Sequence, residues 1–218
     1  GLIFGDTASK IVINDGTFNA LKSIIDYQNN LGVQPNPNIV INGGNFSADP
    51  SVVASYGGVV IKEGFTPIQG ADGRWTLVEG NFIKTEAALK AAFENGGEIV
   101  LGADITLNET LVLGEGKTAV LDLNGKTLSH NEVDTKYVIN NHGNLTIKGN
   151  GTVNSRGIYN GYDADGNYVA AAKLTIENGT FNAKGTNGGA CVYNYGTVAI
   201  NGGNFESVGG YGLNNQSG

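Results

Sequence analysis

The sequence predicts an all-β fold in which short strands wind into stacked coils, a β-helix or β-solenoid. Three observations support this. A strand–turn–strand pattern recurs along the chain, most of its copies lie 24 to 29 residues apart, and the 218 residues include 35 Gly but only 4 Pro. This period is too short for a domain or a propeller blade, and it fits one coil of a solenoid. The Gly residues show no three-residue period, which excludes collagen.

Each copy of the pattern has two apolar residues at alternating positions, a turn with Gly, and a later apolar residue. Alternation places the two apolar side chains on one face of a strand, and Gly permits the turn. The later residue then enters the same interior, so stacked coils about 4.8 Å apart should form internal ladders. Six copies fit: 11–18, 39–46, 121–128, 145–153, 174–181 and 198–205. The predicted core is Ile11, Ile13, Phe18, Ile39, Ile41, Phe46, Leu121, Leu123, Leu128, Leu145, Ile147, Leu174, Ile176, Phe181, Val198, Ile200 and Phe205.

A second pattern, two apolar residues and an Asn-rich turn, precedes several copies of the first. It occurs at 138–143, 192–196 and 213–218. The nearly constant distance to the following strand favours a part of each coil over unrelated turn-rich loops.

One helix is expected, over 85–94. Thr85 is a capping residue, Glu86 lies in the first turn, Leu89 and Phe93 are four residues apart, and two Gly follow Asn95. Strand-like segments come next, so a helix here would cover the exposed end of the first coil.

The segment between the early coils and this helix has no repeat. Asp49 and Pro50 predict a short capped helix or turn. Residues 59–61 and 75–78 are expected to pair as a hairpin across 71–73. Such a unit would close one solenoid before the next begins.

These patterns predict four segments: 1–48 as terminal coils of a β-helix, 49–80 as the closing segment, 81–97 as the capping helix, and 98–218 as the first coils of another β-helix. A further core strand is due where the sequence stops, and residues 1–9 hold apolar residues that could supply it. We therefore expect copies to meet head to tail, within a tandem array or between separate subunits, although an accidental boundary would give the same pattern. The expected assembly ends are Gly1, Leu2, Ile3, Phe4, Leu213 and Gly218.

The coils also resemble a known family. Ile-Asn-Gly-Gly-Asn-Phe (41–46 and 200–205) and Ile-Glu-Asn-Gly-Thr-Phe (176–181) resemble the pectin-lyase-like repeats of large surface and fibre proteins from gut-type bacteria and their phages. Residues 89–128 are similar to the first coils of that family, and 46–78 to its closing segment. The resemblance implies a right-handed parallel β-helix with a short capping helix and a small closing segment, in an extracellular or virion-surface protein. It implies no single function, because this fold serves lyases, adhesins and fibres.

Composition excludes several function classes. The net charge is −7 and Arg occurs only at 74 and 156, which argues against binding of nucleic acid. The sequence contains no run of 18 apolar residues, so it predicts no membrane span. Cys191 is the only Cys, so no intramolecular disulfide forms, and we expect a buried, inert thiol.

Catalytic and metal-binding patterns are weak, and we expect no catalytic residue, no metal and no cofactor. A lyase would need clustered carboxylates and a base, for which Arg156 near Asp163 and Asp165 is the main candidate. Residues 163–167 have the alternating oxygen side chains of a Ca²⁺ loop but lack its downstream Glu, which favours a plain turn. His130 and His142 have no accompanying ligand pair.

Tyrosines are concentrated in the second half of the chain. A candidate aromatic strip for stacking on sugar rings or a protein surface comprises Tyr159, Tyr162, Tyr193, Tyr195 and Tyr211, which could instead pack along the solenoid wall. Two function classes follow: a non-catalytic, structural or adhesive module of an extracellular fibre, with copies of itself as partner, and a glycan-binding or glycan-cleaving surface protein. The absence of a repeated carboxylate position favours the fibre.

Overall fold

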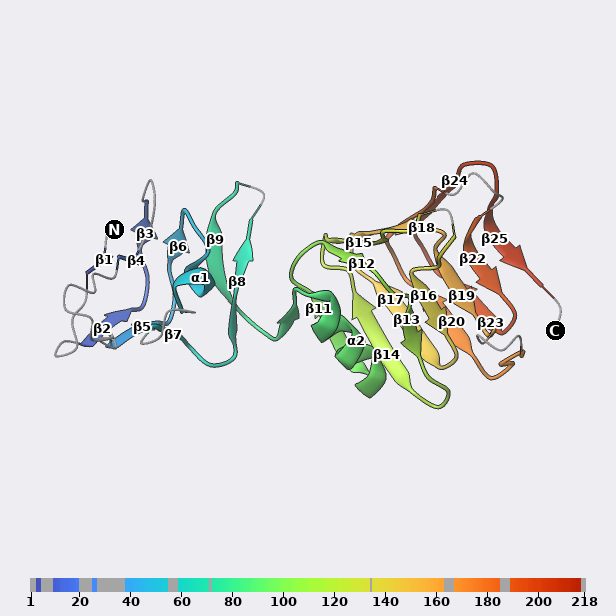
Figure 1. The fold of residues 1–218 in the computed structure, drawn as a ribbon, viewed down its shortest axis with the longest axis horizontal. Helices are drawn as coiled ribbons and strands as arrows, with labels where there is room; N and C mark the ends of the chain where they lie inside the picture. Colours follow the sequence, from blue (N-terminus) through green and yellow to red (C-terminus); the bar gives the residue numbers. More distant parts are fainter. Residues whose placement is uncertain are drawn as a thin grey trace. The chain divides into compact units, whose positions relative to one another are not determined.

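The computed structural model describes residues 3–4, 10–19, 25–26, 38–54, 59–70, 72–133, 135–162, 167–184 and 189–216. The chain divides into two compact units, residues 1–81 and 82–218 (Figure 1). Together they hold about seven turns of parallel β-solenoid, which confirms the predicted all-β fold. In the described residues only two helices accompany the strands.

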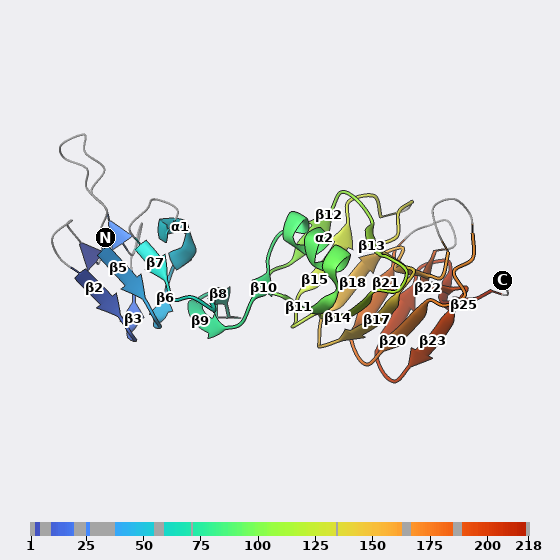
Figure 2. The ribbon, with the colours of Figure 1, turned by 90° about the horizontal axis from the view of Figure 1, so that it is seen from below.

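The second unit contains five coils of three strands each, and equivalent strands of successive coils form three parallel sheets. In Figure 2, strands of the first sheet lie side by side in coil order. The first sheet contains β10 (Phe82–Ile83), β11 (Gly97–Leu101), β14 (Thr118–Asp122), β17 (Asn144–Lys148), β20 (Lys173–Ile176) and β23 (Thr197–Ile200). The second contains β12 (Ile105–Leu107), β15 (Thr127–His130), β18 (Thr152–Ser155), β21 (Thr180–Ala183) and β24 (Asn204–Ser207). The third contains β13 (Leu111–Leu113), β16 (Ile139–Asn141), β19 (Ile158–Asn160), β22 (Ala190–Asn194) and β25 (Tyr211–Asn215).

The expected ladders run through the core of this unit. Ile147 pairs with Ile176 and Ile176 with Ile200 in the first sheet. In the second sheet Phe181 pairs with Phe205, and their rings stack with centroids 5.0 Å apart. The core is therefore a set of side-chain columns that run across the coils.

Burial confirms most of the predicted core but not its last coil. Twelve of the predicted residues are buried, from Ile13 to Phe181. Val198 and Phe205 are only partly buried, and the prediction for Ile200 is wrong, since this residue is 41% exposed whereas Ile176 is fully buried. In the described residues no further coil lies on β23, so one side of Ile200 faces solvent.

A helix, α2 (Glu86–Asn95), covers the other end of this solenoid. The Thr85 hydroxyl accepts a hydrogen bond from the Ala88 amide at 3.3 Å, as expected for a cap. Leu89 and Phe93 are fully buried. The helix lies against the first coil, which is formed by β11, β12 and β13 (Figure 1). The helix thus replaces the coil that would otherwise precede β11.

The first unit is a shorter solenoid with two successive coils. A pair of parallel strands, β1 (Ile3–Phe4) and β4 (Ile25–Asp26), accompanies two larger sheets. One contains β2 (Lys10–Ile13), β5 (Asn38–Ile41) and β7 (Val59–Ile61), all parallel. The other contains, in spatial order, β3 (Thr17–Phe18), β6 (Asn45–Phe46), β9 (Trp75–Glu79) and β8 (Phe65–Gln69). The short helix α1 (Pro50–Ala54) follows β6, and Asp49 accepts a hydrogen bond from the Ser51 amide at 2.8 Å.

The expected hairpin between 59–61 and 75–78 is wrong. Strand β7 joins the parallel sheet beside β5, and β9 pairs instead with β8 across residues 70–74. The shorter connection explains this choice, because hairpin loops are usually two to five residues long. Ile61 of β7 is in register with Ile41, so β7 also extends the parallel sheet of Ile39 and Ile41.

Strand β9 ends the parallel stack of the first unit. It runs antiparallel to β6, so no further parallel coil follows β6 on that side. Arg74 fastens the hairpin: its guanidinium donates to the Asn19 side chain at 2.7 Å and to the carbonyls of Asn45 and Phe18 at 3.2 and 3.3 Å. Trp75 and Leu77 pack against the buried Phe46 cluster and cover it.

The two positions Ile176 and Ile200 give a direct test of the ladder. Ile176→Ala should lower the free energy of unfolding by about 2–5 kcal/mol, because the packed column cannot collapse around the void. Ile200→Ala should cost less than half as much, since its side chain is already 41% exposed. Urea unfolding of dilute protein measures both losses, and equal losses would contradict the proposed coil register.

Candidate functional site

Six tyrosines gather on the outer face of the third sheet. Tyr159 of β19 lies beside Tyr193 of β22, because these positions are in register. The Tyr159 ring centroid is 4.3 Å from that of Tyr137 and 5.6 Å from those of Tyr193 and Tyr195. We call this group the tyrosine cluster; its members are Tyr137, Tyr159, Tyr162, Tyr168, Tyr193 and Tyr195.

The cluster contains four of the five tyrosines of the expected strip. Tyr211 is 60% exposed and, in the part of the chain that the structure describes, makes no ring contact with the others. Tyr137 and Tyr168 join the cluster instead, from the turns that precede β16 and β20. Strand register could have predicted Tyr159 and Tyr193 as neighbours, but turn residues carry no such signal.

Burial and a nearby cation set the chemistry of these phenols. The guanidinium carbon of Arg156 lies 5.0 Å from the Tyr137 ring centroid, a cation–π arrangement. Burial raises the pKa of Tyr137 to about 12, although Arg156 opposes this shift. Burial, with a hydrogen bond to Tyr195, also raises the pKa of Tyr159. Both phenols therefore stay protonated at neutral pH and can donate hydrogen bonds.

A cavity of about 300 Å³ lies beside the cluster. Asn140 is in register with Tyr159, and its side-chain oxygen is buried without a hydrogen-bond partner in the described structure. A ligand with a hydroxyl or N–H group could satisfy this oxygen. The lining residues are Thr110, Val112, Thr135, Lys136, Tyr137, Asn140, Tyr159 and Tyr162.

Inside the same sheet, a column of asparagines replaces the apolar ladder. Asn141 and Asn160 are fully buried, and Asn194 is nearly so. Each amide nitrogen donates to the side-chain oxygen of the next coil: Asn141 to Asn160 at 2.6 Å, Asn160 to Asn194 at 2.6 Å, and Asn194 to Asn215 at 2.7 Å. The Asn-rich turns of the sequence thus build a continuous polar column along the coils.

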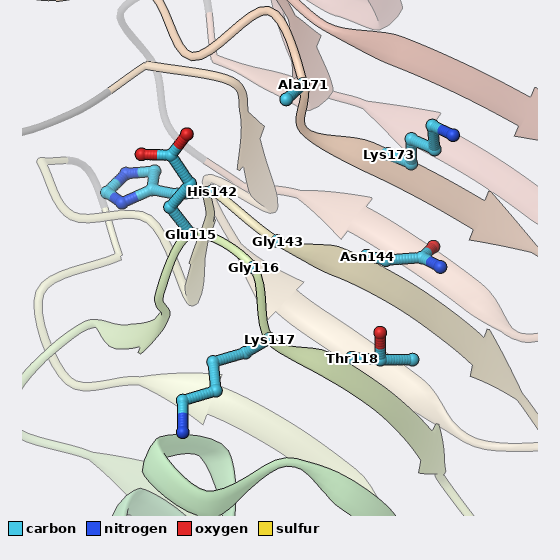
Figure 3. A pocket seen from close by; sticks show the side chains of 9 residues that line it. All are labelled: Glu115, Gly116, Lys117, Thr118, His142, Gly143, Asn144, Ala171 and Lys173. Atoms are coloured by element: carbon cyan, nitrogen blue, oxygen red, sulfur yellow. The ribbon is translucent and has the colours of Figure 1, made fainter.

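A second pocket, of about 270 Å³, lies outside the turns that lead into the first sheet. Figure 3 shows that the side chains of Lys117 and Lys173 extend in different directions and do not converge on one point. Gly143 in its floor serves packing, because a Cβ there would lie 2.4 Å from the Lys117 carbonyl oxygen. The floor of this pocket therefore follows from coil packing, and its two lysines do not act on one point.

The last coil of the second unit exposes its core. We call β23, β24 and β25 the open coil. Ile200 and Leu213 are each 41% exposed, although both continue columns that are buried one coil earlier. Of the other expected assembly ends, Ile3 and Phe4 form β1, while Gly1, Leu2 and Gly218 lie outside the described residues.

The structure describes only some of the residues considered for catalysis or metal binding. Asp163 and Asp165 lie outside that part. His130 is buried, which lowers its pKa, and His142 contacts the Tyr162 carbonyl oxygen through Nε2 at 3.0 Å. The described residues contain no group of three or more His, Cys, Asp or Glu that could hold a metal.

Cys191 is buried, as expected. Its thiol donates to the carbonyl oxygens of Phe181 and Glu206 at 3.1 and 3.2 Å, and burial raises its pKa. A protonated, enclosed thiol is a poor nucleophile.

Neither helix in the described structure is long and apolar enough to cross a membrane. Comparison of the chain with protein-family models, with curated proteins and with solved structures gives no match. The function must therefore be argued from the geometry of the coils.

The tyrosine cluster should make stability depend on pH in the alkaline range. Because Tyr137 has a folded-state pKa of about 12, raised above the unfolded value of about 10, its stabilising effect is present below pH 10 and lost between pH 10 and 12. Tyr137→Phe should make this loss smaller. Thermal unfolding of both proteins at pH 7, 10 and 11.5 measures it, and identical pH dependence would contradict the assignment.

Proposed function

We propose that this chain is a structural, non-catalytic module of an extracellular fibre, and that copies associate by stacking one coil on another. The open coil carries this proposal. Ile200 and Leu213 hold the core positions of a column, yet each is 41% exposed. A surface built like a coil–coil interface fits another coil better than any other partner.

Two forces favour such stacking. Covering a large aliphatic side chain contributes up to about 1.5–3 kcal/mol. The outer edges of β23, β24 and β25 also present backbone groups that a further parallel strand would pair, and in the described residues no strand does so. A contact of this head-to-tail type does not close on itself, so it extends into a filament.

The resemblance of the coils to pectin-lyase-like repeats supports an extracellular setting. Those repeats occur in large surface and fibre proteins of gut-type bacteria and their phages, and we place this chain among such proteins as part of the proposal. The low share of charged residues, 15%, and the high Gly content suit closely stacked turns.

A charge in the open coil should prevent association. Ile200→Asp would place a carboxylate in the coil–coil interface, where its desolvation is unfavourable. We expect wild-type protein to form elongated multimers as its concentration rises, and Ile200→Asp to remain monomeric. Sedimentation velocity and negative-stain electron microscopy measure this.

Val112→Asp is the matched control, because Val112 is similarly exposed, at 46%, but lies in the first coil of the second unit, far in sequence from the open coil. This control should still associate. A wild-type protein that stays monomeric at high concentration, or a Val112→Asp variant that also loses association, would contradict the proposal.

Glycan binding is a second candidate function, and the tyrosine cluster favours it. Protonated phenols, partly exposed rings and the unpartnered Asn140 oxygen are the features that hold a sugar ring by stacking and hydrogen bonding. This function is compatible with the fibre, because the cluster lies on the side of the coils.

Titration with a panel of neutral and acidic oligosaccharides tests the second candidate. Tyr159→Ala should weaken binding at least tenfold, because Tyr159 contacts four other rings of the cluster. Tyr211→Ala, outside the cluster, should leave binding unchanged. Isothermal calorimetry that detects no oligosaccharide binding, or equal losses in both variants, would exclude this function.

A further inference from the structure

The proposed stacking leaves open which strands cover the open coil. Resting on that function, we infer that they are β2 and β3 of a second copy of this chain, in a single register. Ile11 then lies opposite Val198, Ile13 opposite Ile200, and Phe18 opposite Phe205. Through β2 and β3 the contact reproduces the coil–coil interface that the units already contain, whereas β4, the strand that follows β3, is already paired with β1.

The two segments share one template. Residues 11–18 and 198–205 have their apolar residues and their turn Gly at identical spacings. The backbone agrees as well, since Gly16 and Gly203 both adopt positive φ, at 128° and 106°. In the first unit, residues 39–46 follow the same template and stack on residues 11–18. This pair shows how a coil such as 198–205 can be continued by a coil of the same template.

Both edges are open in the described structure. Strands β2 and β3 are the outermost members of their sheets in the first unit, as β23 and β24 are in the second. Ile11 and Phe18 are only partly buried, whereas the equivalent Ile39 and Phe46 one coil further are buried. Each edge therefore lacks the apolar neighbour that the other can supply.

The opposite end of each unit is covered at least over part of its cross-section, although β7 remains an outermost parallel strand in the first unit. In the first unit the antiparallel hairpin β8–β9 ends the parallel stack, and in the second α2 covers the first coil. Within the described residues, the edge at β2 and β3 and the edge at β23 and β24 are those where neighbouring sheets both end in a parallel strand without a covering helix. The two edges also match in direction along the stack, because β2 is the first strand of its parallel sheet and β23 is the last strand of its own.

Backbone hydrogen bonding agrees with this register and excludes shifts by an odd number of residues. The Thr197 and Asn201 amides donate to the preceding coil, at Ala172 and Ile176, so the Val198 and Ile200 groups face the open edge. In β2 the Ile13 carbonyl accepts from Asn42, so the groups of Val12 and Asn14 face outward. In the inferred register the Val12 amide donates to Val198 and the Asn14 amide to Ile200.

Side-chain columns also continue across this contact. The Phe181–Phe205 and Phe18–Phe46 rings stack with the same centroid spacing, 5.0 Å, and nearly the same interplanar angle, 10° and 11°. Placing Phe18 on Phe205 joins these pairs into one stack of four rings. The Asn42 side-chain amide donates to the Asn14 side-chain oxygen at 2.8 Å, and the Asn14 side-chain amide would donate to the Asn201 side-chain oxygen in the same way.

Engineered disulfides test the register. Val12 and Ala199 are exposed, outward-facing and opposite each other in it, so Val12→Cys/Ala199→Cys should oxidise into a ladder of covalent multimers. Adjacent parallel strands lie about 4.8 Å apart, within the Cα separation of a disulfide. The native Cys191 is buried and should not interfere. Non-reducing electrophoresis after mild oxidation gives the readout.

Two further pairs sharpen the test. Thr17→Cys/Asn204→Cys reports the same register in the second sheet and serves if the first pair folds poorly. Lys10→Cys/Ala199→Cys is shifted by two residues, which separates the Cα atoms by about 8 Å and should prevent the bond. Circular dichroism of the reduced variants checks their folding.

The outcomes separate this inference from the proposed function. Absence of any association would overturn both. If the protein associates but the shifted pair cross-links, the register is wrong and the proposed fibre is unaffected. The same holds if Ala199→Cys alone cross-links, because this single variant can do so only when two open coils meet face to face. Multimers from both matched pairs and from neither control are the result we expect.

Discussion

Backbone pairing between successive coils is the interaction on which this fold depends. In a strand of a parallel solenoid, alternate residues direct their backbone amide and carbonyl groups toward the coil before it and the coil after it, so each coil needs a neighbour on both faces. The helix α2 and the β8–β9 hairpin each cover a coil that has no further parallel coil beside it. The open coil meets it on one face only, and the exposed Ile200 is the direct consequence.

The asparagine column gives the stack a second constraint. Apolar columns tolerate small shifts of one coil on another, but a buried amide must find its partner at hydrogen-bond distance. Asn141, Asn160 and Asn194 each donate to the following coil and also to a nearby backbone carbonyl, so their orientation is fixed on both sides. We infer that the column specifies register in the third sheet, as the phenylalanine stack does by shape in the second.

Much of this architecture could be predicted from the sequence, because alternating apolar residues and a repeated turn Gly act locally. The ladder through Leu121, Ile147 and Ile176 follows from the template alone. Burial of Ile200 could not be predicted, since it depends on a neighbouring coil and not on its own strand. The pairing of β9 with β8 could not be predicted either, because β7 and β8 were both possible partners for β9. The positions of Tyr137 and Tyr168 could not be predicted because they depend on the path of turns.

The open coil and the tyrosine cluster occupy different kinds of surface, and this difference connects the two proposed functions. The open coil becomes buried when a second copy covers it, whereas the outer face of the third sheet stays accessible when coils stack. A fibre built as proposed would therefore present one tyrosine cluster per copy along its length. Binding sites that are weak alone gain effective affinity when many are linked at fixed spacing. Stacking of the ends would then strengthen whatever the cluster binds, without any change in the cluster itself.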